Sequence, residues 1–290
     1  SLVAVLCGTQ NGNHIAQQMK RTSFLFLHLT LCLSSTHAQS SSPATTEVSY
    51  LVTCIKDTIE GKVLTDTFRL RFNDNTAMFY SKETFRDDSL RYNDKESWLK
   101  EGSLTLKKKQ RANKAGMSYY VLTDLKLRTY TYKDKIGLNA FRYTDSLPTF
   151  NWQILPEHKN IAGHKCTKAV GKYMGRTYEA WFATDITACL GPWKFYGLPG
   201  LVMSVYDTHR QYTFTFIDMQ PCNGDVALFP SRTFKTTKEK FLKEYATYQS
   251  DPIAYYATRS LTRISFGAPD SQLVQEIKNN NRHQPMEILE

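Results

Sequence analysis

The chain has 290 residues, of which 41% are hydrophobic and 22% charged, enough for one large hydrophobic core. Its formal net charge is +10, a balance that suits a polyanionic partner. The sequence contains no Gly-x-Ser-x-Gly elbow, paired-histidine zinc helix, glycine-rich phosphate loop or Cys-x-x-Cys pair, which argues against the enzyme classes and cofactors that these motifs define.

The N-terminal region has the pattern of a secretory signal. Met19 is followed by the basic pair Lys20-Arg21, by the apolar run Phe24–Leu33 and by the small-residue site Thr36–Ala38. The apolar run is about ten residues long, which is too short to cross a bilayer as a helix. The pattern therefore predicts a cleaved signal peptide rather than a buried N-terminal helix.

This reading divides the chain into four parts. We expect residues 1–18 to be an over-long N-terminal extension, 19–38 the signal peptide, 39–46 a flexible lead-in, and 47–290 a single domain. Cleavage after Ala38 leaves 252 residues with a formal charge of +8, because the removed part holds two basic and no acidic residues. The product is expected to be soluble, in the periplasm or at the outer membrane, where the available polyanions are envelope polymers and not nucleic acid.

Strand patterns dominate the region after the lead-in. Runs of β-branched and aromatic residues, separated by polar turns, predict strands at residues 48–55, 63–72, 77–81, 118–122, 126–132, 138–143 and 150–155, the last ended by Pro156. Further runs predict two hairpins, 161–173 with 176–183 and 202–206 with 212–217. In the strand at 63–72, Arg69 and Arg71 alternate with apolar residues, which predicts one buried and one wet face.

Two regions depart from the strand pattern. The basic run Lys107–Lys109 is expected to be a solvated loop or hairpin tip. Near the C-terminus, Thr236 and Glu239 fit a capping box, and the apolar stripe Phe241, Leu242, Tyr245 and Tyr248 predicts a helix. Residues 271–279 predict a second, weaker helix. The fold class is therefore mainly β: an antiparallel sheet, as a barrel, half-barrel or sandwich, with one or two short C-terminal helices.

The most informative stretch is 191–201, which reads GPWKFYGLPGL. Two glycine- and proline-rich turns, Gly191-Pro192 and Gly197-Leu198-Pro199-Gly200-Leu201, enclose an aromatic patch. Proline followed by glycine is typical of a type II turn, in which glycine takes a positive φ. The aromatic patch is expected to plug the end of the core; the alternative is a platform that binds a ligand.

Several motifs of this region resemble the GLPGLI family. They are the 191–202 run, the segment Ile161–Cys166, the strand 175–182 reading GRTYEAWF, and the pair Asp185-Ile186. His164 and Val202 depart from the family pattern. That family comprises exported bacterial envelope proteins of unassigned activity, so the resemblance implies an envelope location without a reaction. It also implies a partner, because genes of this family often lie near TonB-dependent transporters of the outer membrane.

The leading functional hypothesis is non-catalytic binding of an unidentified ligand. The candidate binding residues are the large aromatic and charged side chains of the matched motifs: Arg176, Trp181, Asp185, Trp193, Lys194 and Tyr196. Arg176 and Lys194 would hold an anionic group or pair with nearby acids. The alternatives are a hydrolase of an envelope polymer, which would use carboxylates such as Glu179 and Asp185, and a structural accessory of an outer-membrane transporter.

A metal site is a further alternative that the sequence does not favour. His158, His164 and Cys166 lie close together, and two imidazoles with a thiolate suit a soft metal. However, nothing in the spacing fixes His158 relative to the other two. Satisfied or exposed histidines are the simpler interpretation, so no metal is expected.

Four cysteines follow the signal region, and an oxidising compartment favours two disulfides. A hairpin turning at residues 208–210 places Cys222 near the end through which Cys189 enters, which predicts the pair Cys189–Cys222. Cys54 and Cys166 then form the second pair. A Cys166–Cys189 bridge is the competing arrangement, and four buried free thiols are the remaining possibility.

Overall fold

The structure is a computed structural model that describes residues 43–100, 117–259, 272–279 and 285–287. The expected extension and signal peptide, and the basic run Lys107–Lys109, lie outside these residues. Within them, no helix combines the length and the apolar character needed to cross a membrane.

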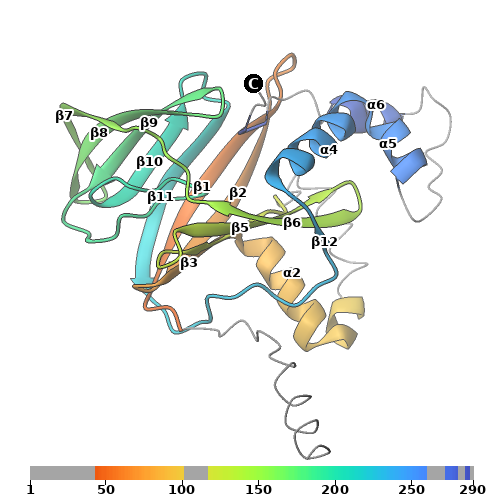
Figure 1. The fold of residues 1–290 in the computed structure, drawn as a ribbon, viewed down its shortest axis with the longest axis horizontal. Coiled ribbons are helices and arrows are strands. Elements are labelled where there is room, and N and C mark those ends of the chain that lie inside the picture. Colours follow the sequence, from red (N-terminus) through yellow and green to blue (C-terminus); the bar gives the residue numbers. More distant parts are fainter. Residues whose placement is uncertain (1–42, 101–116, 260–271, 280–284, 288–290) are drawn as a thin grey trace, which may run out of the picture. The chain divides into compact units, whose positions relative to one another are not determined.

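The fold is mainly β, as predicted, with the described strands joined in one open, twelve-stranded sheet (Figure 1). The strands are β1 (Thr46–Asp57), β2 (Lys62–Phe72), β3 (Thr76–Ser81), β4 (Tyr120–Asp124), β5 (Thr129–Ile136), β6 (Asn139–Ser146), β7 (Gln153–Ile161), β8 (His164–Tyr173), β9 (Arg176–Ala183), β10 (Leu201–Asp207), β11 (Tyr212–Pro221) and β12 (Phe234–Lys235). Their order is β12-β6-β5-β4-β3-β2-β1-β11-β10-β9-β8-β7. All neighbours are antiparallel except β12 and β6, which are parallel.

Alternating side chains give the sheet two different faces. The inner face, which carries Tyr50, Phe68 and Phe79, holds the main hydrophobic core. The outer face carries a smaller cluster that includes Met78 and Tyr80. Adjacent residues of β3 therefore point into different clusters, as the two-residue period of a strand requires.

Helices cover both faces. Helix α2 (Lys82–Asn93) contacts β2 and β3, whereas α4 (Lys238–Ser250) contacts β5 and β6 (Figure 1). Helices α5 (Pro252–Arg259) and α6 (Gln272–Asn279) follow α4 along the chain. The predicted cap at Thr236 is one residue early: Thr237 has the extended backbone of a cap, and its hydroxyl accepts from the Lys240 amide.

Both predicted hairpins are present. Met174 and Gly175 have φ values of 47° and 72°, the paired positive angles of a tight two-residue hairpin turn between β8 and β9. Ser204 faces Thr215 in the second hairpin, close to the expected register. The seventh strand differs from expectation because β7 continues through Pro156. This strand lies at the sheet edge with a register shift between Ile154 and His158, where a missing amide donor is tolerated.

The predicted wet face of β2 is largely covered. Arg69 and Arg71 both pair with Glu47, which is 1% exposed, and the Tyr80 hydroxyl donates to the same carboxylate at 3.0 Å. Residues 43–46, the described end of the expected lead-in, are held in place as well: the Ala44 amide donates to the Gly224 carbonyl at 2.8 Å, and Ala44 is buried.

Candidate functional site

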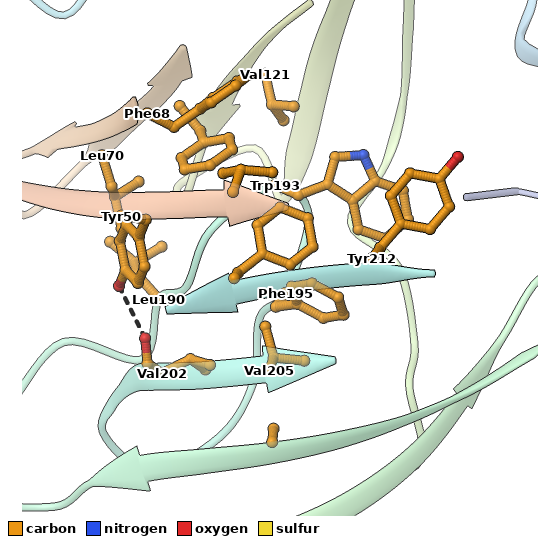
Figure 2. Close-up of a cluster of buried hydrophobic side chains, with 14 of the residues drawn as sticks. Tyr50, Phe68, Leu70, Val121, Leu190, Trp193, Phe195, Val202, Val205 and Tyr212 are labelled. Atoms are coloured by element: carbon orange, nitrogen blue, oxygen red, sulfur yellow. Dashed lines mark hydrogen bonds between the residues drawn. The ribbon is translucent and has the colours of Figure 1, made fainter. Parts of the chain in front are cut away.

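The 191–201 stretch connects β9 to β10 and inserts its aromatic side chains into the main core. Trp193 and Phe195 are 3% and 1% exposed. Figure 2 shows Phe195 among side chains of the main core, and the ring centroids of Trp193 and Phe195 lie 5.3 Å apart. The core-plug expectation therefore fits Trp193 and Phe195, whereas Tyr196 is only half-buried.

The turn at Pro199-Gly200 is tighter than the type II turn expected. The Gly200 amide donates to the Leu198 carbonyl at 2.8 Å, which closes a three-residue γ-turn around Pro199. Proline suits the centre of such a turn because its φ is fixed near −65°. Gly200 itself has a φ of +154° and lies against the backbone of Ala183.

Lys194 lies at the centre of a buried polar group on the inner face. Its side chain is 0% exposed, and its Nζ donates to Glu287 Oε2 at 2.6 Å and to the Tyr143 hydroxyl at 3.0 Å. Glu287 Oε1 accepts from the Tyr173 hydroxyl at 2.9 Å and lies 3.4 Å from Lys238 Nζ. One carboxylate therefore has two ammonium groups and two hydroxyl groups around it.

Burial and charge shift the titration of this pair. Burial lowers the pKa of Lys194 to about 8, against the attraction of Glu287. Burial alone would raise the pKa of Glu287, but the charges of Lys194 and Lys238 outweigh it and hold that pKa below its ordinary value. Near neutral pH the two groups therefore form a buried ion pair.

Side chains of β9 also hold the segment Pro285–Glu287, which belongs to no helix or strand. Arg176 Nε donates to the Pro285 carbonyl at 2.9 Å, and the Tyr178 hydroxyl donates to the Met286 carbonyl at 3.0 Å. Arg176 is itself fixed by an ion pair with the buried Asp207, with Nη1 and Oδ2 2.9 Å apart. We call residues 285–287 the strap.

Beside the strap, the inner face has a cavity of about 350 Å³ that is partly open to solvent. Its wall includes seven aromatic side chains: Tyr119, Tyr132, Trp193, Tyr212, Phe241, Tyr245 and Tyr248. The last three belong to the predicted apolar stripe of α4. Tyr119 is 5% exposed, and within the described residues its buried hydroxyl has no hydrogen-bond partner. Because this oxygen is inaccessible to a water-sized molecule, the cavity presents the ring of Tyr119 and not its hydroxyl.

Two carboxylates reach the cavity wall, and both accept hydrogen bonds from the protein. Asp134 accepts from the Ser118 hydroxyl at 2.5 Å and from the Tyr132 hydroxyl at 3.1 Å. Glu287 is ion-paired with Lys194. A hydrolytic pair needs one protonated and one ionised carboxyl, and the lowered pKa of Glu287 leaves it only the ionised role, in which it is already paired with Lys194.

The sequence-based candidates separate into two groups. Arg176, Trp193 and Lys194 gather around the strap, as described above. Trp181 lies elsewhere, with the ammonium of Lys159 4.1 Å from its ring centroid. Asp185 is exposed, and its carboxylate accepts from His164 Nδ1 at 2.7 Å.

Tyr196 also lies apart from the strap group. Arg128 stacks on its ring, and its carbonyl accepts from Trp152 Nε1 at 3.0 Å.

The structure does not bring together the residues of the alternative hydrolase and metal sites. Glu179 lies within β9 and accepts from Tyr206 and Trp181, whereas Asp185 follows the end of that strand beside His164. His158 contacts the Thr167 hydroxyl at 3.1 Å instead of His164 or Cys166. Within the described residues, no group of three potential metal ligands comes together.

The predicted disulfides are wrong in this structure, since Cys54, Cys166, Cys189 and Cys222 are all free. Cys54 on β1 and Cys166 on β8 are separated in the sheet by β11, β10 and β9, well beyond the roughly 7 Å between Cα atoms that a bridge allows. Cys222 packs with the outer cluster, whereas Cys189 adjoins Leu190, a residue of the inner core. The competing Cys166–Cys189 bridge is absent too, because Cys166 pairs with Ala183 and Cys189 lies in the exposed loop beyond.

Comparisons with known proteins identify no function for this site. No family model matches the chain, and no curated protein matches it. Among solved structures it is similar to two crystal forms of PNGF-II, with TM-scores of 0.49 and 0.48 at 12% and 13% identity. The matches cover 71% of this chain but only 34% and 33% of the PNGF-II chains, so it spans about a third of their length. Likeness at this level carries no information on function.

Proposed function

We propose that this is a non-catalytic binding protein that holds a small, largely apolar molecule in the aromatic cavity. The observation that carries the proposal is the cavity of about 350 Å³, whose wall includes seven aromatic side chains. Ligand pockets of proteins are typically about 300–1,000 Å³, mostly apolar, with a few placed polar groups. Ser118, Asp134 and Lys135 supply the polar groups of this wall.

The cellular setting is part of the same proposal. The signal pattern at residues 19–38 supports export to the periplasm or outer membrane, and the motif resemblance at 191–202 supports membership of the GLPGLI family. A TonB-dependent transporter or an envelope polymer is then the expected partner. A hydrolase acting on such a polymer through Glu179 and Asp185 is the alternative, and the separate hydrogen-bond partners of these two carboxylates give it no support.

Binding of a neutral fluorescent probe tests the proposal. N-phenyl-1-naphthylamine brightens in apolar sites, and we expect it to bind saturably at one molecule per chain. Leu64 lines the cavity, whereas its neighbour Val63 is 51% exposed. Leu64→Trp should fill the cavity and weaken probe binding at least tenfold, and the matched control Val63→Trp should leave it unchanged. Absence of saturable binding, or equal loss in both variants, would contradict the proposal.

A further inference from the structure

The carboxylate of Glu287 occupies a site that the rest of the fold builds. Its four donors come from four different places: Lys194 from the 191–201 stretch, Tyr143 from β6, Tyr173 from β8 and Lys238 from α4. These elements are fixed by the sheet and by the packing of α4. Only the carboxylate arrives on an irregular segment, the strap.

The charged form of Lys194 depends on an anion at this position. Its side chain is 0% exposed, and a buried ammonium without a counter-charge costs several kcal/mol. The ring centroids of Tyr132 and Trp193 lie 4.6 and 5.0 Å from its Nζ, and these rings supply only their π-faces. The site is therefore built for a carboxylate or similar anion, whichever molecule supplies it.

The anion site and the aromatic cavity are continuous. Tyr132 and Trp193, which flank Lys194, also line the cavity, and so does Glu287 itself. An apolar molecule in the cavity could therefore place an acidic group at Lys194 only by taking the position of Glu287.

We infer that the Lys194 site is the anion subsite of the cavity, and that the ligand is an apolar carboxylate which replaces the strap's Glu287 when it binds. This inference rests on the proposed binding function. The exchange keeps the ion pair, since one carboxylate replaces another. It breaks the bonds from Arg176 and Tyr178 to the strap carbonyls, which burial of the ligand's apolar body must offset.

Competition by Glu287 makes a quantitative prediction. A ligand that must displace an internal occupant has an apparent binding constant equal to its intrinsic one multiplied by the fraction of molecules in which the site is open. Removing the Glu287 carboxylate should therefore strengthen binding of an acidic ligand and leave a neutral ligand of the same shape unaffected.

Isothermal titration with 2-naphthoate and its neutral counterpart 2-naphthalenemethanol tests the inference. We expect Glu287→Ala to bind naphthoate at least tenfold more tightly than the wild type, with the affinity for naphthalenemethanol changed less than twofold. The double variant Lys194→Met/Glu287→Ala, which removes both charges, should lose that gain. Circular dichroism checks that each variant is folded.

A measurement on the wild type covers the case in which Glu287→Ala does not fold. Met286 packs against the core, so its ¹³C-labelled methyl group should shift toward the position of a solvent-exposed methionine when naphthoate saturates the protein. Naphthalenemethanol should leave that signal in place. If naphthalenemethanol binds but neither the affinity gain nor the Met286 shift occurs, the inference is overturned and the cavity remains a binding site. If neither compound binds any variant, the proposed function itself fails.

Discussion

Gly200→Ala is the substitution whose effect follows most directly from the backbone geometry. Gly200 ends the γ-turn at Pro199 and immediately precedes β10, whose first residue, Leu201, pairs with Ala183. A Cβ at position 200 would lie 2.7 Å from the Ala183 carbonyl carbon and closer still to its oxygen. These are backbone atoms of a paired strand, so they cannot move aside as a flexible side chain would.

The magnitude has two sources. A φ of +154° is accessible almost only to glycine, and forcing another residue into such a region costs about 1–3 kcal/mol. Overpacking against the β9 backbone adds about 1–3 kcal/mol. The sum of about 2–6 kcal/mol corresponds to a fall in Tm of roughly 5–20 °C for a domain of this size.

Gly61→Ala is the matched control. Gly61 also has a positive φ, +67°, but an added Cβ would meet nothing within 4 Å. It should cost about 1 kcal/mol, from backbone strain alone. Thermal and denaturant unfolding of both variants provides the comparison. A Gly200→Ala protein no less stable than Gly61→Ala would refute the reasoning.

Three further predictions concern charge, thiols and processing. Burial lowers the pKa of Lys194 to about 8 from 10.5, so between pH 8 and 10.5 the unfolded chain binds more protons than the folded one. The stability of the wild type relative to Lys194→Met should therefore rise by up to about 3 kcal/mol as pH increases across that window. Denaturant titrations that show no such trend would contradict the burial of Lys194. Iodoacetamide should label the exposed Cys189 of the native protein and spare Cys166, whose thiol pKa is raised to about 11 by burial. When the protein is unfolded without reduction, mass spectrometry should find all four thiols alkylated. N-terminal sequencing should find the stable product beginning near Gln39, and an intact Met19 would disprove cleavage.

Local patterns in the sequence predicted most of the sheet. Strands such as β2 alternate more buried and less buried residues, and a period of two can be read without knowing the partner strand. The turn at Met174-Gly175 could likewise be predicted from its own residues. Errors arose where contacts with distant residues determine the local structure. Pro156 is accommodated because β7 is an edge strand. Thr237 replaces Thr236 as the helix cap because the chain leaves β12 only at that residue.

The candidate site was only half predictable. Lys194 and Trp193 stood out because they lie in a distinctive motif, and the α4 stripe had helical spacing. Glu287 is 93 residues from Lys194 and lies in no periodic segment, so nothing near it in the sequence indicates a buried ion pair. Tyr119 and Asp134 resemble the many other tyrosines and acids of the strands, and only the sheet brings them to one cavity.

The disulfide prediction failed for a related reason. It placed Cys54 and Cys166 together because both are strand-interior positions, but strand order in the sheet is not readable from strand patterns. The hairpin register that underlay the Cys189–Cys222 pair was nearly correct, with Ser204 facing Thr215. The register alone did not reveal that Cys222 packs on the outer face.

The most direct test of the binding account is to locate a bound probe. Crystals soaked with 6-bromo-2-naphthol should show the bromine anomalous peak inside the cavity between α4 and the sheet. The naphthol rings should lie against the α4 side chains that line the cavity, Phe241, Tyr245 and Tyr248. An empty cavity beside a bromine peak on another surface would contradict the account.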